Sequence, residues 1–172
     1  MRIKRIYNRN LGPVENMNIE FHMNSDNTPK PVILVGENGT GKSTVLSNIV
    51  DSFYEMAGKA YRNVRERDGD GYQNYKAIVS SEIKIGQNFM LSFIEFSESD
   101  NENIVCQYVF KGGKLEYDEF VRETGVDELN IKNKWKNENN IKDIIVLKED
   151  VQKNFDRNVF CYFGPERYEK PQ

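Results

Sequence analysis

The sequence predicts an α/β fold, in which a lobe that carries a phosphate-binding loop is joined to an antiparallel β-subdomain. Three observations support this fold class: an aliphatic run at 32–35, a glycine-rich loop at 36–44 and an amphipathic helical pattern from 45 to 57. Alternating strand patterns between 76 and 117 supply the second sheet. We therefore expect residues 1–172 to form a single partial domain.

The composition is that of a soluble domain without a general affinity for nucleic acid. The chain has 172 residues, 24 Lys and Arg against 27 Asp and Glu, and a net charge of −3. Its longest apolar runs, Val32–Val35 and Ile144–Leu147, are too short to cross a membrane, and the N-terminus lacks the long apolar core of a secretion signal. We expect a cytoplasmic protein with no membrane partner, in which Cys106 and Cys161 are core thiols.

The segment 1–58 is predicted to run strand, strand, loop, helix. Residues 2–7 and 15–23 read as strands separated by a Leu11-Gly12-Pro13 turn. The run Val32–Val35 reads as a strand buried on both faces, because it is continuously aliphatic rather than alternating. The helix that follows is predicted to end at Gly58 and Lys59. Its apolar face is expected to consist of Val45, Leu46, Ile49, Val50, Phe53 and Ala57.

The remaining chain gives weaker signals. Residues 76–117 read as an antiparallel meander that begins with Ile83 and Ile85. Residues 127–143 are rich in Asn and Lys and are predicted to be a polar loop. The segment 144–163 is predicted to be a helix followed by a short strand at 159–163. The helix rests on the spacing of Ile144, Leu147, Val151 and Phe155.

The loop at 36–44 matches the Walker A pattern, Gly36-x-x-x-x-Gly41-Lys42-Ser43. Glycines allow backbone N–H groups to surround a phosphate, and the start of the following helix adds a partial positive charge. Lys42 is the expected catalytic residue and partner of the β- and γ-phosphates of ATP, and Ser43 the expected ligand of Mg²⁺. The predicted nucleotide-binding residues are Gly36, Glu37, Asn38, Gly39, Thr40, Gly41, Lys42, Ser43 and Thr44.

Residues 36–44 resemble the Gly-x-Asn-Gly-x-Gly-Lys-Ser-Thr form of ABC-type ATPases, a class of P-loop NTPases. Within that class the chain looks most like the SMC/RecF/OLD group, which also begins with a strand, a turn similar to residues 10–13, and a second strand. Residues 160–169 are similar to a Tyr-Phe-Pro-x-x-Arg segment of some bacterial defence-type AAA/ABC ATPases. The resemblance implies action in DNA maintenance or phage defence, and ATP hydrolysis by the complete protein.

The resemblance also implies parts that this sequence lacks. ABC-type ATPases need a signature motif, a Walker B carboxylate pair and a switch histidine, and the single histidine, His22, lies in a predicted strand before the loop. We therefore expect the chain to be an N-terminal lobe alone. Its expected partners are a C-terminal lobe, or a second head in a homodimer that sandwiches ATP, and DNA in the complete protein.

Four alternatives remain open. Residues 144–150 mimic a Walker B strand and would make a compact NTPase, although Lys148 stands where the metal-binding Asp should be. The chain is alternatively a non-catalytic nucleotide-binding interaction module. Two groups of basic residues are candidates for contacting nucleic acid. They are Lys59, Arg62, Arg65 and Arg67, and Lys132, Lys134, Lys136 with Trp135.

Overall fold

The structure is a computed structural model that describes residues 1–26, 28, 30–61, 77–98, 103–146, 152 and 155. Its elements are β1 (Arg2–Leu11), β2 (Val14–Glu20), α1 (Lys42–Ala60), the short 3-10 helix η2 (Ser80–Glu82), β3 (Phe89–Ser97), β4 (Ile104–Gly113), α2 (Tyr117–Thr124), α3 (Leu129–Asn137) and β5 (Ile141–Val146).

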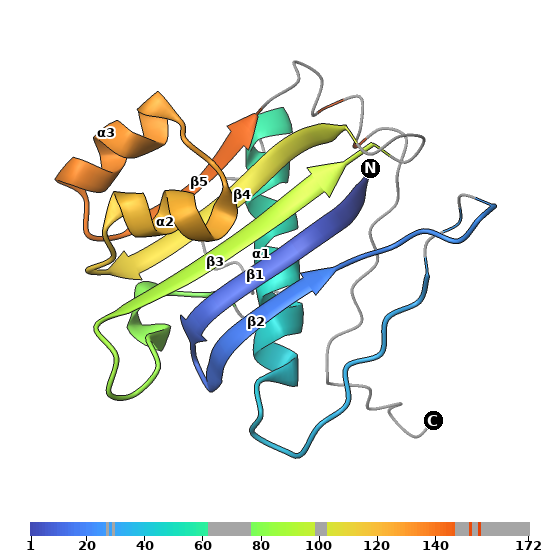
Figure 1. Cartoon of the computed structure of the whole chain (residues 1–172), viewed down its shortest axis with the longest axis horizontal. Helices are drawn as coiled ribbons and strands as arrows, with labels where there is room; N and C mark the ends of the chain where they lie inside the picture. Colours follow the sequence, from blue (N-terminus) through green and yellow to red (C-terminus); the bar gives the residue numbers. More distant parts are fainter. Residues whose placement is uncertain are drawn as a thin grey trace, which may run out of the picture.

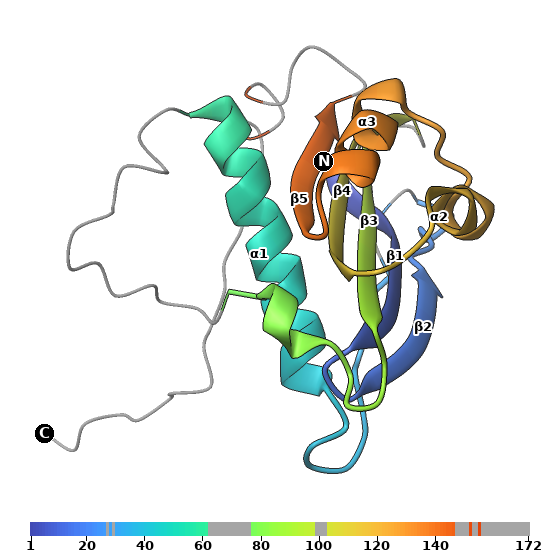
Figure 2. The same ribbon diagram turned by 90° about the vertical axis from the view of Figure 1, so that its left-hand side faces the viewer.

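A five-stranded sheet in the order β2-β1-β3-β4-β5 forms the centre of the molecule, and every pair of neighbouring strands is antiparallel. The long helix α1 crosses one face of this sheet, and α2 and α3 cover the other face (Figures 1 and 2). Each face carries its own apolar core, one around Phe93 and Trp135 and the other around Ile94 and Met56. The described residues thus form three layers.

The predicted strands at the start of the chain and in the meander are present. Residues 2–7 and 15–23 correspond to β1 and to a shorter β2, and the turn between these strands has Gly12 at φ 53°. Strands β3 and β4 pair over their whole lengths. The predicted strand at Ile83 and Ile85 is wrong, because Ile83 makes only an isolated bridge to Leu11 and Ile85 is 98% exposed.

The run 32–35 is neither a strand nor buried, which corrects the sequence prediction. Val32, Ile33 and Val35 are 48%, 82% and 89% exposed. A continuous aliphatic strand needs hydrogen-bonding neighbours and cover on both faces. Among the described residues, the sheet ends at β2 and offers the run neither.

Helix α1 begins at Lys42 as predicted and continues through Gly58 and Lys59 to Ala60. Its predicted apolar face is only partly the buried one, because Leu46 is 47% exposed and Ile49 and Phe53 are half-buried. The side of α1 that meets the sheet instead mixes polar and apolar residues. The buried residues of the helix are Val45, Ser47, Asn48, Val50, Asp51, Ser52 and Met56.

The predicted polar loop at 127–143 is wrong as well. Residues Leu129–Asn137 form α3, whose Ile131 and Trp135 lie four residues apart and are both buried against the sheet. These two anchors are enough to fix a short helix that is otherwise polar. Residues 141–146 form β5, so the predicted helix at 144–155 does not begin at Ile144, while Leu147 and Val151 lie outside the described residues.

Strand β1 fastens α2 to the sheet through charged and aromatic side chains. The Arg5 guanidinium donates to the backbone carbonyl of Glu123 at 3.1 Å, and Arg9 forms an ion pair with Glu119 at 2.5 Å. The hydroxyl of Tyr7 donates to the carboxylate of Glu123, and burial together with this contact raises the pKa of Tyr7 to about 12. These contacts fix the position of α2 through β1, the strand whose Asn8 also accepts a hydrogen bond from Asn48 of α1.

Strand β5 is tied to α1 by two ion pairs of opposite polarity. Lys142 donates to the buried carboxylate of Asp51 at 2.6 Å, and Asp143 pairs with Lys59 at 3.0 Å. Asp143 also accepts from Lys134 of α3. The pairs lie along the C-terminal half of α1, so they fix its axial position against the sheet.

In the described ranges, no helix is long and apolar enough to span a bilayer.

The Asp143 carboxylate is expected to make folding sensitive to acid. Burial acts to raise its pKa, but hydrogen bonds from Lys134 and Lys59 outweigh burial and lower the pKa below 3.8. A lowered pKa stabilises the fold above the unfolded-state pKa, and that contribution is lost as the pH falls through the folded-state pKa. Asp143→Asn should cost about 1 kcal/mol of unfolding free energy near neutral pH, a size typical of partly exposed pairs.

Urea titrations at a series of pH values measure this effect. The Asp143→Asn variant should lose less stability than the wild type between neutral pH and pH 3. Replacement of the exposed Glu20 by Gln is the control and should leave the pH profile unchanged. Parallel profiles for the wild type and Asp143→Asn would contradict this role of the ion pairs.

Candidate functional site

The candidate site is the start of α1. Gly41 is the residue immediately before the helix and has left-handed backbone angles, φ 97° and ψ 9°. The described first turn carries no acidic side chain. The first N–H groups of any helix lack partners within the helix, and the helix dipole places a partial positive charge there. The start of α1 is therefore suited to an anion.

The loop before the helix is shaped by two left-handed glycines, Gly39 at φ 84° and Gly41 at φ 97°. Thr40 closes a turn by donating its side-chain hydroxyl to the carbonyl of Glu37 at 2.9 Å. A β-carbon added at Gly41 would lie 2.6 Å from Cγ2 of Val14, so the loop backbone is pressed against the β1–β2 hairpin. Only glycine satisfies both the angle and the close approach.

The side chain of Lys42 folds back against the backbone of this loop. Its ammonium donates to the carbonyl of Gly36 at 2.7 Å and to that of Glu37 at 2.6 Å. An ammonium has three donors, so a phosphate oxygen can become a further partner without displacing both carbonyls. Ser43, the predicted metal ligand, is exposed on the first turn, and the adjacent Thr44 is half-buried beside Gly12. The structure therefore brings the predicted loop residues together around one helix start.

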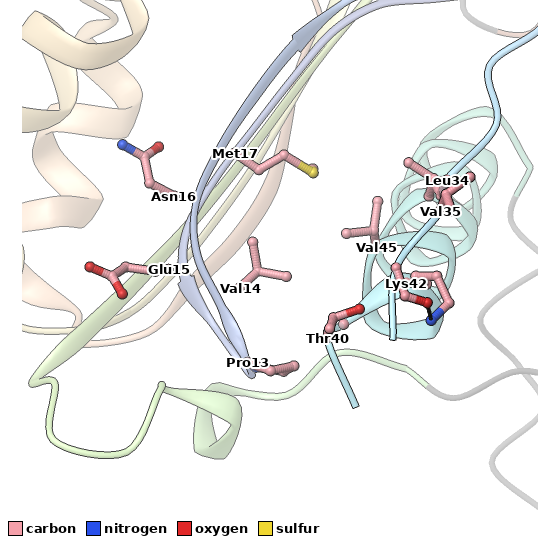
Figure 3. Close-up of a pocket in the computed structure, with 12 residues that line it drawn as sticks. Pro13, Val14, Glu15, Asn16, Met17, Leu34, Val35, Thr40, Lys42 and Val45 are labelled. Atoms are coloured by element: carbon pink, nitrogen blue, oxygen red, sulfur yellow. Dashed lines mark hydrogen bonds between the residues drawn. The ribbon is translucent and has the colours of Figure 1, made fainter. Parts of the chain in front are cut away.

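A cavity of about 460 Å³ adjoins the loop. Figure 3 shows Val14 and Met17 of β2 pointing toward Val45 of α1, while Glu15 points away. The volume lies within the range of ordinary ligand pockets, and an apolar wall with a cationic end suits a ligand that has both parts. The lining residues are Pro13, Val14, Glu15, Asn16, Met17, Leu34, Val35, Gly36, Thr40, Gly41, Lys42 and Val45.

The residues Gly36 to Thr44 fit a nucleotide phosphate and its magnesium ion, judged by the donor set. The cradle at Gly41 would be filled by any β-carbon, Lys42 supplies a cation, and Ser43 places an exposed hydroxyl one residue later. Sequence reasoning missed Val14 and Met17 as cavity-lining residues. The only available signal was the Gly12-Pro13 turn, which brings β2 back beside the loop.

The described part of the alternative Walker B segment lies away from this loop. Strand β5 is at the sheet edge opposite β2, and Asp143 pairs with Lys59 near the far end of α1. Lys59 follows Lys42 by 17 residues, a helical rise of about 25 Å. The acidic residues Glu149 and Asp150 of that segment lie outside the described residues.

Three of the four candidate nucleic-acid residues of α3 make contacts within the fold, and the fourth, Lys136, is exposed. Trp135 is 7% exposed and its indole N–H donates to the carbonyl of Leu115, so it cannot stack on a base, which corrects the sequence hypothesis. Lys134 pairs with Asp143, and Lys132 lies over the ring of Tyr117.

The remaining sequence candidates divide between buried, exposed and undescribed positions. Burial raises the pKa of the Cys106 thiol to about 12, as expected of a core thiol. His22 is exposed beyond the end of β2. Of the other basic cluster, Lys59 pairs with Asp143. Arg62, Arg65, Arg67, Cys161 and the segments 159–163 and 160–169 lie outside the described residues.

Comparison with known proteins gives one family match. A family model described as an AAA domain matches residues 5–172, which is nearly the whole chain and includes the loop, α1 and the sheet. None of the curated proteins matches the chain.

Alanine at Gly41 should be more damaging than alanine at Gly39. Both glycines are left-handed, so each substitution costs about 1–2 kcal/mol of backbone strain. An added β-carbon at Gly39 meets nothing within 4 Å, whereas at Gly41 it would also meet Val14 at 2.6 Å. We expect Gly41→Ala to lower the unfolding free energy by about 1 kcal/mol more than Gly39→Ala, a typical cost of overpacking.

Urea denaturation of the two single variants measures the difference directly. Equal losses would show that the loop can move away from the hairpin at no cost. In that case the close approach of Gly41 to β2 would not be a constraint on the site.

Proposed function

The chain belongs to the AAA domain family, and from this premise we propose that it is the ATP- and Mg²⁺-binding N-terminal lobe of an SMC/RecF-like ABC ATPase. Family membership supports a nucleotide-binding, ATPase-like domain of the P-loop kind. The finer assignment to SMC/RecF-like ATPases is the proposal, and it is supported by the form of residues 36–44 and the order of elements that precede them.

The observation that carries the proposal is the geometry of the loop at the start of α1. Gly41 provides a left-handed cap with no room for a side chain, and Lys42 holds its ammonium against the loop carbonyls. An ATP triphosphate is an anion of the size and charge that such a cradle binds. The adjoining cavity next to Val14 and Met17 supplies an apolar wall for the rest of the nucleotide.

Each loop residue has a distinct role in the proposed activity. Backbone N–H groups of the loop and of the first turn would surround the phosphates, and Lys42 would neutralise the β- and γ-oxygens. Ser43 would hold Mg²⁺, which supplies charge neutralisation at the phosphates when bound. The protein contributes positioning and electrostatics, the two effects on which phosphoryl transfer mainly depends.

We propose that a second lobe completes the fold on the outer side of α1. The aliphatic run at 32–35 is exposed, and Leu46 and Tyr54 of α1 are 47% and 45% exposed on the same helix that carries the loop. Exposed aliphatic side chains that follow one another along a chain are typical of an interface. The partner is a C-terminal lobe or a second head, and the missing signature and Walker B residues would arrive with it.

We further propose that the complete protein acts on DNA or on an effector in phage defence. This action is supported only by the resemblance of residues 160–169, which lie outside the described residues. The alternative function is a non-catalytic module that binds nucleotide for structural or regulatory reasons. The cavity lining favours this alternative for the chain by itself, because its single carboxylate, Glu15, points away from Lys42 (Figure 3).

Lys42→Ala should weaken binding of a labelled ATP analogue by about tenfold or more, because a charge-assisted contact to phosphate is lost. Fluorescence titration of the purified chain measures the dissociation constant. Lys114→Ala is the matched control. Lys114 is an exposed lysine on the connection to α2, and its replacement removes the same charge. Equal affinities for the wild type and Lys42→Ala would contradict the proposed nucleotide site.

The isolated chain should hydrolyse ATP at a negligible rate, because the water-activating carboxylate is expected on the completing lobe. Phosphate release under conditions of saturating ATP measures the rate. Robust turnover that is lost in Glu149→Gln or Asp150→Asn would overturn this expectation. That result would revive the compact NTPase, with its Walker B strand at 144–150.

A further inference from the structure

The face of α1 that meets the sheet combines apolar packing with a buried network of polar side chains. Asn48 is completely buried and donates its amide N–H to Oδ1 of Asn8 at 3.1 Å and to Oγ of Ser92 at 2.8 Å. The Ser92 hydroxyl in turn donates to Oδ1 of Asn48 at 3.1 Å. Asn8 and Ser92 are also completely buried, on the adjacent strands β1 and β3. We call Asn8, Asn48 and Ser92 the amide clamp.

Apolar packing against the sheet holds α1 in place but fixes its rotation less sharply than hydrogen bonds do. Met56 is completely buried and the ring of Phe53 packs edge-on against Phe96 of β3 with 5.2 Å between centroids, while Leu46 is 47% exposed. The hydrophobic effect is non-directional, so these contacts do not by themselves select one angle of the helix about its axis. Hydrogen bonds fix both a distance and an angle, and an unpaired buried amide is costly. The amide clamp therefore selects the observed rotation.

One atom of the amide clamp indicates that holding α1 in this rotation costs folding free energy. The amide nitrogen of Asn8 is buried and has no hydrogen-bond partner among the described residues. A buried donor without a partner destabilises a fold, whereas an apolar replacement of the whole cluster would not carry that penalty. The cluster is thus poorly explained by stability alone, and a role in specifying orientation accounts for it better.

Rotation of α1 matters most at its first turn. Asn48 follows Lys42 by 6 residues, a rise of about 9 Å, over which a helix behaves as a rigid rod. A rotation of about 20° would move a side-chain tip about 5–6 Å from the helix axis by about 2 Å. Mg²⁺ requires its ligands at close to one distance and in octahedral geometry, so a shift of that size at Ser43 would remove the metal contact.

We propose that the amide clamp is a positioning device for the nucleotide site, which fixes the rotation of α1 so that Ser43 and Lys42 face the phosphates together. This inference rests on the proposed nucleotide-binding function. It adds Asn8, Asn48 and Ser92 to the residues on which nucleotide binding depends. They touch neither nucleotide nor metal, and they act through the orientation of the helix.

Strand β3 offers a matched pair of substitutions that tests the clamp. Ser92 and Ser97 are both completely buried, but Ser92 bonds to Asn48, whereas the hydroxyl of Ser97 has no partner among the described residues. Ser92→Ala should raise the dissociation constant of a labelled ATP analogue about threefold in Mg²⁺, the size of one lost hydrogen bond. In EDTA the change should be smaller than about 1.5-fold, because without the metal the Ser43 contact contributes nothing. Ser97→Ala should leave both constants unchanged.

An all-apolar clamp separates positioning from stability. The variant Asn8→Leu, Asn48→Leu, Ser92→Ala replaces every partner at once, which mutational series show can be neutral or stabilising. We expect unfolding free energy to be maintained while the Mg²⁺-dependent gain in nucleotide affinity falls about tenfold, since a displaced ligand loses most of its contact. If this variant does not fold, the Ser92→Ala and Ser97→Ala pair decides the question alone.

The outcomes distinguish this inference from the proposed function. If the wild type binds the nucleotide, Lys42→Ala weakens binding and the clamp variants retain the wild-type dependence on Mg²⁺, the clamp is merely structural and the inference is overturned. If Lys42→Ala binds as the wild type does, the proposed function itself fails. A loss of Mg²⁺ dependence in Ser92→Ala but not in Ser97→Ala supports the clamp.

Discussion

The backbone at Gly41 is the constraint on which the candidate site depends. It must be left-handed to turn the loop into the helix, and it must lack a side chain because Val14 of the β1–β2 hairpin lies against it. The hairpin therefore determines where the loop can lie, and the loop determines where α1 begins. This explains why the loop at 36–44 depends on the antiparallel sheet in this chain: β2 is the wall against which the loop is formed.

Helix α1 buries polar as well as apolar side chains against one face of the sheet and exposes two large apolar ones. The side toward the sheet carries Asn48 and Asp51, which bond to strands β1, β3, β4 and β5, while Leu46 and Tyr54 are exposed. Val50 and Met56 are buried on the helix as well, so the side toward the sheet is mixed rather than purely apolar. The exposed Leu46 and Tyr54 mark the side that the proposed second lobe would cover.

The start of α1 was more predictable from the sequence than the sheet and helices around it, for a physical reason. The loop at 36–44 is local, since glycine angles and a helix start depend on residues that adjoin one another, and the structure has α1 beginning at Lys42 as expected. The errors at 32–35 and at 127–146 depend on distant contacts. A run of aliphatic residues does not reveal whether strands will flank it, and the polar composition of α3 obscured the two anchors Ile131 and Trp135.

The burial of α1 shows the same limit of pattern reading at a finer scale. The apolar residues of α1 do recur at helical spacing. That spacing shows which residues can pack against a neighbour, but it does not show whether the neighbour is the sheet or another part of the protein. Asn8, Asn48 and Ser92 come from three elements, and nothing in their sequence spacing indicates that they meet. Their meeting shows why the apolar periodicity was an incomplete guide to the buried face: directional hydrogen bonds place polar side chains on the side of α1 that packs on the sheet. In the resulting rotation the first turn adjoins the cavity beside β2.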